Sequence, residues 1–304
     1  MSFDVDRGEV VGIVGESGSG KTMTALSLLR LVPEPGIVSG RILYGEQDVL
    51  QMADDEIREF RGNEVAMIFQ DPMTSLNPVL RVGFQIEEAM DAHKRFTKQQ
   101  ARERVVPMLQ RVRIPASKDR VKDFPHQFSG GMRQRAMIAM GVSNEPSLLI
   151  ADEPTTALDV TIQAQIIELM KELQERIGMA VLFITHNLGI AAEIADRITV
   201  MYAGRIVEEG PAEAIFETPR MPYTMGLLRS VPRLGLERRA GGLDAIPGNV
   251  PSPLDLPKGC AFHPRCGFFV AGLCDTAVPP LEECGSGHLV RCVRWREVAA
   301  EAAQ

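Results

Sequence analysis

The sequence predicts an α/β fold in which a mostly parallel sheet is covered by helices on both faces. Two observations predict it: short apolar runs rich in β-branched residues alternate with helical patterns, and each run is continuous, as in buried parallel strands. A third observation concerns the rest of the chain. Residues 72–125 carry apolar positions at helical spacing among charged residues, and all five cysteines lie after residue 259. We therefore expect an inserted helical subdomain at about 72–145 and a small cysteine-rich appendage.

The elements of the predicted core follow one another along the chain. The first strand runs directly into a glycine-rich turn and then a helix. Prolines end that helix, and a short strand and turn are expected next. Strands are expected within residues 9–15, 39–49, 64–70, 147–154 and 179–186, and helices within 21–31, 132–142 and 163–177.

The composition changes after about residue 211. Six prolines and a pair of adjacent glycines fall within residues 232–264, so long elements are not expected there. We place a linker at about 232–258 because domain boundaries favour such segments. The sequence thus predicts a main domain over residues 1–231 and a linker with a cysteine-rich region over 232–304.

Charge and hydropathy exclude several classes of protein. The chain has 33 Lys and Arg against 40 Asp and Glu, a net charge of −7, which argues against a nucleic-acid binder. The longest apolar stretches, such as residues 180–184, fall far short of the ~20 residues that span a bilayer. Residues 1–9 contain no apolar signal region. We expect a cytoplasmic protein that can associate with a membrane protein.

A glycine-rich motif follows the first strand. Glycines let backbone N–H groups converge on phosphate oxygens, the helix N-terminus adds partial positive charge, and Lys21 adds a full one. The hydroxyl of Thr22 is a candidate ligand of Mg²⁺. The pattern G-x-x-x-x-G-K-[ST] predicts that a nucleoside triphosphate binds at Gly15, Glu16, Ser17, Gly18, Ser19, Gly20, Lys21 and Thr22.

Two acidic residues end the strand expected within 147–154. Ligands of open α/β sheets gather at the carboxyl ends of strands, where Asp152 and Glu153 lie. We expect Asp152 to hold Mg²⁺, directly or through water. We expect Glu153 to polarise the water that attacks the γ-phosphate.

A second turn with adjacent glycines opens the helix after Phe128. Ser129, Gly130 and Gly131 combine a hydroxyl, close backbone approach and free N–H groups at a helix start, which together can bind an anion. This turn resembles the signature sequence of ATP-binding-cassette (ABC) ATPases, with Phe128 and Met132 as departures. The resemblance implies a P-loop ABC ATPase core that binds ATP and Mg²⁺. It also implies a dimer in which this turn reaches the γ-phosphate held by the other subunit.

Further elements similar to those of the ABC family appear in the family's order. Gln70 matches the Q-loop, which in the family senses Mg²⁺ and links the helical subdomain to the membrane partner. Residues 157–159 match the D-loop at the dimer interface, and His186 matches the switch histidine that contacts the γ-phosphate. The resemblance thus implies a catalytic role for His186 beside Glu153, and a role for Gln70 in holding Mg²⁺.

Local strings narrow the resemblance. Residues 69–78, 222–224 and 259–266 look like segments of the ATP-binding subunits of bacterial dipeptide, oligopeptide and nickel importers. This implies import of peptides or nickel with two transmembrane permease subunits, a second ATPase subunit, paralogous or identical, and indirectly an extracytoplasmic solute-binding protein. It also implies a peripheral position on the cytoplasmic face of the inner membrane. The alternative is a soluble ABC ATPase that acts outside transport.

The cysteine tail allows three interpretations. Four thiolates spaced C-x5-C-x7-C-x17-C can hold a [4Fe–4S] cluster, or structural Zn²⁺, although the C-x2–4-C pairs typical of zinc sites are absent. The third interpretation is that the thiols are buried and bind nothing. The resemblance to importers implies the cluster, because some members carry one in a similar tail. The candidate ligands are Cys260, Cys266, Cys274 and Cys292, and Cys284 is left out because it lies in an acidic, flexible-looking segment.

Overall fold

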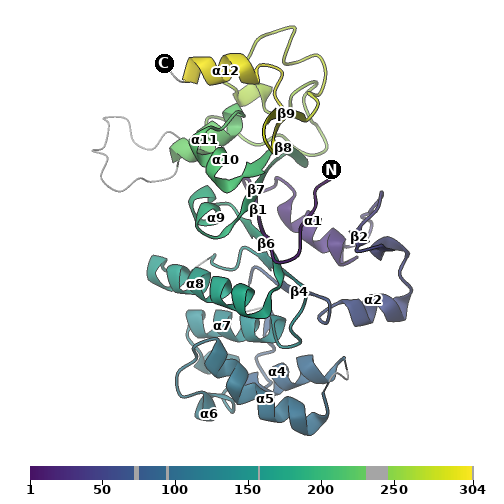
Figure 1. The fold of residues 1–304 in the computed structure, drawn as a ribbon, viewed down its shortest axis with the longest axis vertical. Helices are drawn as coiled ribbons and strands as arrows, with labels where there is room; N and C mark the ends of the chain where they lie inside the picture. The colour runs from purple at the N-terminus through teal and green to yellow at the C-terminus, as the bar shows by residue number, and fades with distance from the viewer. Residues whose placement is uncertain (72–74, 94–95, 157, 231–245, 303–304) are drawn as a thin grey trace. The chain divides into compact units, whose positions relative to one another are not determined.

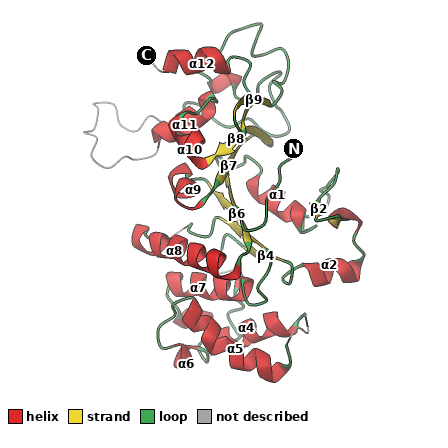
Figure 2. Cartoon of the chain, in the orientation of Figure 1, coloured by secondary structure: helices red, strands yellow, loops and turns green. Residues whose placement is uncertain are grey.

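The computed structural model describes residues 1–71, 75–93, 96–156, 158–230 and 246–302 (Figure 1). The chain forms two compact units. The first unit comprises Met1–Asp4, Val10–Thr22 and Phe183–Gln304, and the second comprises Val5–Glu9 and Met23–Leu182. Both strands and helices occur in each unit (Figure 2).

The alternation of strands and helices confirms the predicted α/β class. The strands of the described chain are β1 (Val10–Val14), β2 (Leu43–Tyr44), β3 (Gln47–Asp48), β4 (Val65–Ile68), β5 (Leu148–Asp152), β6 (Ala180–Thr185), β7 (Arg197–Tyr202), β8 (Arg205–Pro211), β9 (Glu282–Gly285) and β10 (His288–Val290). Its α-helices are α1 (Lys21–Leu28), α2 (Asp54–Phe60), α4 (Val82–Asp91), α5 (Lys98–Arg111), α6 (Ser117–Arg120), α7 (Gly130–Gly141), α8 (Val160–Ile177), α9 (Leu188–Ile194), α10 (Ala212–Glu217), α11 (Pro222–Ser230) and α12 (Trp295–Ala302). Short 3₁₀ helices are η1 (Val49–Gln51), η2 (Pro125–Gln127) and η3 (His263–Arg265). None of the helices in these described ranges is both long and apolar enough to cross a membrane.

A parallel strand pair and a group of helices make up much of the second unit. β4 pairs with β5 in parallel, from Val65 opposite Leu148 to Ile68 opposite Ala151. Both strands are largely buried, as their continuous apolar sequences predict. The helices α4, α5 and α7 pack against one another and form the blue to blue-green part of the ribbon (Figure 1).

The first unit contains antiparallel strand pairs that the sequence did not predict. β1 runs parallel to β7, whereas β8 pairs antiparallel with both β7 and β10, and β10 pairs antiparallel with β9. A tight turn joins β7 to β8, and its residues Ala203 and Gly204 have φ values of 46° and 75°. Gly204 adopts such a value without steric strain, whereas Ala203 does not. Because alanine is not typical of tight hairpin turns, the sequence signal for this hairpin was weak. Three of these four pairs are antiparallel, whereas the sequence predicted a mostly parallel sheet and no strands after residue 186.

The cysteine-rich region holds more regular structure than its prolines and glycines suggested. The segment around Cys284, expected to be irregular, forms strand β9. The side chain of His288 at the start of β10 is buried, and its Nε2 lies 2.9 Å from Oε1 of Glu208 in β8. Strand pairing and this buried polar contact therefore attach the hairpin to the sheet of the first unit.

Three aromatic rings from distant parts of the sequence pack together in the first unit. Tyr202 ends β7, Tyr223 lies in α11, and Phe262 precedes η3. The ring centroids of the two tyrosines are 4.7 Å apart, and that of Phe262 lies 5.3 Å from each of them. All three side chains are buried. We call these residues the aromatic cluster, and they connect β7, α11 and the cysteine-rich region.

Candidate functional site

The predicted phosphate loop spans residues 15–20 between β1 and α1. A Cβ atom on Gly15 would lie 2.3 Å from the carbonyl oxygen of Met201, so no other residue fits there. Gly18 and Gly20 have φ values of +79° and +102°, which favour glycine. The three glycines are therefore required by the shape of the loop itself.

Lys21 lies against this loop at the N-terminus of α1. Its side chain is buried, and Nζ donates to the carbonyl oxygens of Gly15 at 2.8 Å and Glu16 at 3.1 Å. Two other groups fit a bound nucleotide and its metal ion. The buried Oγ of Ser19 has no hydrogen-bond partner within the described chain, and Thr22 is exposed. This part of the chain thus offers a cation, a hydroxyl and helix N–H groups to phosphate.

Asp152 and Glu153 lie at the end of β5, where the sequence places them. Asp152 is almost fully buried. Glu153 has a φ of 47°, an uncommon left-handed conformation for a residue other than glycine. Its Oε2 accepts hydrogen bonds from Nε2 of Gln70 at 3.1 Å and Oγ1 of Thr156 at 2.9 Å. The predicted water-activating carboxylate and the predicted metal-sensing amide are therefore in direct contact.

The signature-like turn forms the N-terminus of α7. Ser129 caps this helix, and its Oγ accepts from the backbone N–H of Met132 at 3.3 Å. One of the N–H groups expected to be free is thus bonded within the turn. Gly130 is exposed, and a Cβ atom on Gly131 would lie 2.8 Å from Cγ2 of Ile162 in α8. The turn therefore presents Ser129 and Gly130 to solvent and packs closely at its second glycine.

The remaining predicted elements lie at ends of strands and helices. His186 follows β6 directly and is exposed, and Asn187 then caps α9. In the D-loop-like segment, the side chain of Asp159 caps α8. Three predicted segments lie partly outside the described residues: Ala157 of the D-loop, 72–74 of the importer-like string, and 231–245, which include much of the expected linker.

Each unit holds part of the predicted nucleotide-binding set. The phosphate loop, Lys21, Thr22 and His186 belong to the first unit, and Gln70, Asp152, Glu153 and the signature-like turn belong to the second. Within the first unit, the structure joins Lys21 to the loop by hydrogen bonds. Within the second, it joins Gln70 to Glu153.

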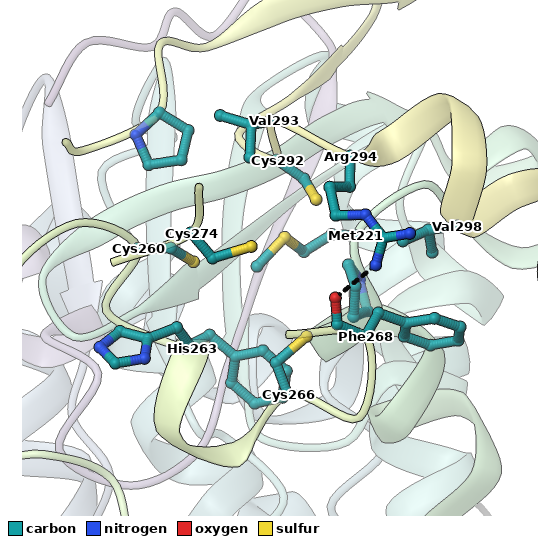
Figure 3. Close-up of a pocket in the computed structure, with 13 residues that line it drawn as sticks. Met221, Cys260, His263, Cys266, Phe268, Cys274, Cys292, Val293, Arg294 and Val298 are labelled. Atoms are coloured by element: carbon teal, nitrogen blue, oxygen red, sulfur yellow. Dashed lines mark hydrogen bonds between the residues drawn. The ribbon is translucent and has the colours of Figure 1, made fainter. Parts of the chain in front are cut away.

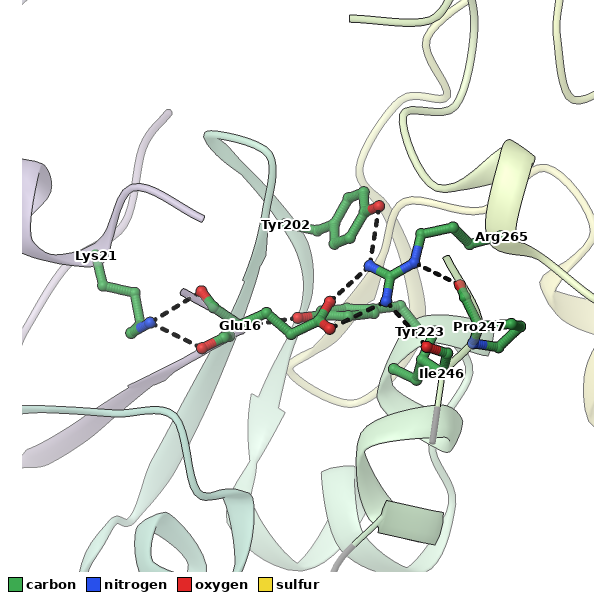
Figure 4. Close-up of polar contacts among 8 residues, drawn as sticks. Glu16, Lys21, Tyr202, Tyr223, Ile246, Pro247 and Arg265 are labelled. Atoms are coloured by element: carbon green, nitrogen blue, oxygen red, sulfur yellow. Dashed lines mark hydrogen bonds and ion pairs between the residues drawn. The ribbon is translucent and has the colours of Figure 1, made fainter. Parts of the chain in front are cut away.

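Sequence reasoning missed two partners of the phosphate loop. The backbone N–H of Glu16 donates to the hydroxyl of Tyr223 at 2.8 Å, and its carboxylate lies 2.7 and 3.0 Å from two nitrogens of Arg265 (Figure 4). These partners are 207 and 249 residues away in sequence, so no local motif indicates the contacts. The available sequence signal was that each residue lies in an importer-like string, Tyr223 in 222–224 and Arg265 in 259–266.

Four cysteines line one pocket of the first unit, which we call the cysteine pocket. Figure 3 shows their sulfur atoms around the side chain of Met221, which is buried. The space left is about 20 Å³, roughly the room of one or two water molecules. Cys284 is not in the pocket lining; its Sγ donates to the carbonyl oxygen of His288 at 3.2 Å. The lining residues include the four predicted ligands, Cys260, Cys266, Cys274 and Cys292.

The surroundings of these thiols have two opposite effects on the thiol pKa. Burial raises the pKa of Cys260 and Cys266, and it raises the pKa of Cys292 to about 12. Hydrogen bonding to the backbone that follows each of these three cysteines lowers the pKa, but by less than burial raises it. Across the described residues, no three His, Cys, Asp or Glu side chains form a group that could hold a single metal ion.

Known proteins resemble this chain over most of its length. A family profile described as ABC transporter matches residues 1–156, and one described as oligopeptide/dipeptide transporter, C-terminal region, matches residues 207–274. A putative peptide import ATP-binding protein of Brucella ovis is 53% identical over 97% of this chain and 90% of its own length. The oligopeptide transport ATP-binding protein AppD of Bacillus subtilis is 48% identical over 99% of this chain and 92% of its own. The dipeptide transport ATP-binding protein DppD of Escherichia coli is 49% identical over 96% of this chain and 89% of its own length.

Solved structures share the fold. A protein named cbiO1 from Clostridium perfringens, part of the ABC transporter complex cbiONQ, superposes with a TM-score of 0.63 at 27% identity, covering 72% of this chain and 84% of that one. A dimeric ATP-binding cassette in a post-hydrolysis state with ADP and Pi superposes with a TM-score of 0.61 at 28% identity, covering 69% of this chain and 88% of that one. The resemblance to importer ATPases is therefore confirmed. This chain belongs to the ABC transporter family, as an ATP-binding protein with the C-terminal region of oligopeptide and dipeptide transporters.

Proposed function

We propose that this chain binds and hydrolyses ATP to energise the import of peptides through a membrane permease. The observation that carries the proposal is that peptide import and transport ATP-binding proteins match nearly the whole chain, including the C-terminal region. The geometry of the phosphate loop and of Lys21 supports ATP as the nucleotide. Peptides rather than nickel are the proposed cargo. A soluble ABC ATPase outside transport, the alternative, is not favoured by these relatives.

The phosphates are assigned to the loop and to the start of α1. The N–H of Glu16 donates to Tyr223 and that of Ser19 donates to the carbonyl oxygen of Glu16. We therefore assign the backbone contacts to N–H groups within residues 17–21 other than that of Ser19, with the Lys21 ammonium beside them. Thr22, Gln70 and Asp152 are the proposed holders of Mg²⁺. This ion neutralises charge on the transferring phosphoryl group when it is bound.

Glu153 is the proposed general base, and His186 is proposed to contact the γ-phosphate. The hydrogen bonds from Gln70 and Thr156 orient the Glu153 carboxylate, and an oriented carboxylate can polarise the attacking water. The left-handed backbone of Glu153 supports this role, because strained residues cluster at active sites. The turn at Ser129 to Gly131, of which Ser129 and Gly130 are exposed, is proposed to bind the γ-phosphate held by a second ATPase subunit.

The proposed assembly contains two such ATPase subunits and two transmembrane permease subunits. The second ATPase subunit is a paralogue or an identical copy, and a solute-binding protein outside the cell delivers the peptide. The dimeric cassette that shares this fold supports the ATPase pair. We place the chain at the cytoplasmic face of the inner membrane as a peripheral subunit, where its ATP supply lies.

Glu153→Gln tests the catalytic assignment. We expect at least a ~100-fold loss of kcat, because removing a general base typically costs two to four orders of magnitude, with ATP affinity within about threefold. The assay is ATP hydrolysis by the chain assembled with its permeases, together with equilibrium ATP binding. Glu168→Gln is the matched control, since this exposed glutamate of α8 pairs with Arg113 at the surface. Full turnover by the Glu153 variant would overturn the assignment.

For the cysteine pocket, we propose a [4Fe–4S] cluster held by Cys260, Cys266, Cys274 and Cys292. The presence of all four thiols in the lining of one pocket supports ligand roles, since a [4Fe–4S] cluster is held by four cysteine thiolates. A single zinc ion needs thiolates about 3.8 Å apart around Zn–S bonds of about 2.3 Å. A cluster takes one thiolate for each of its four irons, which matches the four cysteines of the pocket lining. The C-x2–4-C pairs typical of zinc sites are absent from the sequence, which also favours the cluster.

Cys266→Ser and Cys284→Ser together test the proposed cluster. Anaerobically purified protein should show broad visible absorption that bleaches on reduction, with about four irons per chain. We expect Cys266→Ser to reduce the iron content and the absorption. Cys284→Ser should leave both unchanged, because Cys284 is bonded to His288 in the β9–β10 hairpin and is not among the pocket residues. Colourless native protein with stoichiometric zinc would contradict the proposal.

A further inference from the structure

Arg265 of the cysteine-rich region uses all the hydrogen-bond donors of its guanidinium within the first unit. Two of them reach the two carboxylate oxygens of Glu16 at 2.7 and 3.0 Å. The other three donate to the hydroxyl of Tyr202 at 3.3 Å and to the carbonyl oxygens of Ile246 at 3.3 Å and Pro247 at 2.9 Å. The Arg265 side chain is only 5% exposed. A buried guanidinium with every donor paired is held in one geometry.

Glu16 is fixed at three points, and two of them lie outside the phosphate-loop motif. Its carboxylate binds Arg265, its backbone N–H donates to Tyr223, and its carbonyl oxygen accepts from Nζ of Lys21 (Figure 4). The same residue therefore connects the cysteine-rich region to the lysine that the phosphates require. A shift of the guanidinium would be transmitted to the loop backbone and to that ammonium.

Both outside anchors of the loop lie beside the cysteine pocket. Arg265 directly precedes Cys266, and Tyr223 lies two residues after Met221, whose side chain sits among the four thiols in Figure 3. Phe262 of the aromatic cluster also lines the pocket. A metal group that draws the thiols around itself has to displace the methionine side chain. Its binding would therefore move residues next to both anchors.

We propose that Arg265 is a positioning residue for ATP binding, through which the cysteine pocket controls the phosphate loop. Arg265 holds Glu16 in the conformation that places Lys21 for the phosphates. Loading of the pocket then changes ATP affinity, and by thermodynamic linkage ATP changes the affinity of the pocket for its metal group. The role of Arg265 in ATP binding stands on contacts within the first unit, whereas its link to the pocket rests on the proposed cluster.

The first experiment measures ATP binding at equilibrium and steady-state hydrolysis for Arg265→Met, Glu16→Gln and the double variant, in the full chain assembled with its permeases. We expect each single change to raise the ATP Kd and KM about tenfold with kcat within about twofold, and the double variant to match the larger single effect, because paired residues are not additive. A purely structural role would lower the fraction of active protein and leave KM unchanged. An unchanged ATP Kd, or additive effects, would overturn the proposal.

Arg197→Met is the matched control for removing an arginine that pairs with a buried carboxylate, although 19% of the Arg197 side chain is exposed. Arg197 pairs with Glu209 in the same unit, but it lies opposite Val11, whereas the phosphate loop follows Val14 at the other end of β1. We expect its ATP Kd to stay within about twofold of the native value, as for a site without contact to the loop. An equal rise in Kd for both arginine variants would assign the effect to general destabilisation.

The second experiment tests the link to the pocket with Cys266→Ser in the native chain and in the Arg265→Met background. We expect about a fivefold change in ATP Kd in the native chain, the lower end of typical coupling, and no change once Arg265 is absent. Equal changes in both backgrounds would mean that the coupling bypasses Arg265. If the native protein carries no metal, the cluster and the pocket link both fail, while the ATP Kd of Arg265→Met still decides the positioning role.

Discussion

The phosphate loop and the cysteine pocket belong to the same unit, yet their binding groups are held in different ways. In the loop, the required shape comes from three glycines, and the N–H, carbonyl and carboxylate groups of Glu16 all have partners. In the pocket, the binding groups are side chains on turns, with protonated thiols favoured by burial and Met221 lying between them. The loop is therefore arranged for its ligand, whereas the pocket has to release protons and move a side chain.

This difference assigns different tasks to the two regions. A preorganised loop binds phosphate without a large reorganisation, which suits a site that turns over repeatedly. A pocket that rearranges on loading has two states, and two states are what a controlling element needs. The aromatic cluster lies in contact with both regions, so its integrity should matter to each.

Phe262→Ala should have the largest effect, because this ring lines the cysteine pocket and packs against Tyr223, whose hydroxyl accepts from the phosphate loop. Removing it leaves a cavity among Tyr202, Tyr223 and the pocket, and should lower the free energy of unfolding by about 3–5 kcal/mol. We also expect weaker ATP binding, since Tyr223 loses packing support. Chemical denaturation and ATP titration measure both effects. Lower stability with an unchanged ATP Kd would show that the two regions are independent.

Gly15→Ala should have the next largest effect and should act on the loop alone. The added Cβ meets the carbonyl oxygen of Met201, and overpacking of this kind costs about 1–3 kcal/mol. We expect lower thermal stability and loss of ATP binding, with the visible absorption of the pocket retained. Gly267→Ala is the control, because no atom lies within 4 Å of its added Cβ. Normal ATP binding by the Gly15 variant would contradict a rigid loop.

Tyr223→Phe should have the smallest effect, because it removes one hydroxyl and keeps the ring. The N–H of Glu16 then loses its partner, which corresponds to about 0.5–1.5 kcal/mol, or roughly a 2- to 10-fold rise in ATP Kd. Isothermal titration of ATP measures the change. Tyr44→Phe serves as the control, since its hydroxyl bonds Glu64 and Ser147 in the second unit. Equal ATP affinities for the native chain, Tyr223→Phe and Tyr44→Phe would show that the Tyr223 hydroxyl does not contribute to ATP binding.

Much of the fold and of the nucleotide site was predictable because the signals are local. The apolar runs that became β1, β4, β5 and β6 are continuous in sequence, and burial on both faces requires that pattern. The phosphate-loop motif occupies eight consecutive residues that run from the end of a strand into the start of a helix, so its identity and its context are recognised together. The same holds for Asp152 and Glu153 at the end of β5.

The contacts that hold the loop could not be predicted, because they join residues far apart in the chain. Arg265 is 249 residues from Glu16, and the importer-like string that contains it does not indicate which residue it binds. The contact between Gln70 and Glu153 spans 83 residues and depends on the pairing of β4 with β5. The β9–β10 hairpin was missed because its strands have only four and three residues, and because β9 begins with two glutamates.

The most direct test of the central claim is peptide uptake by vesicles that contain the permeases and this chain with its partner ATPase. We expect uptake that requires ATP on the side where this chain lies, and ATP hydrolysis that rises when the peptide and its binding protein are present. The Glu153→Gln variant should bind ATP and support no uptake. Peptide uptake at the native rate with that variant, or hydrolysis indifferent to permease and peptide, would contradict the account.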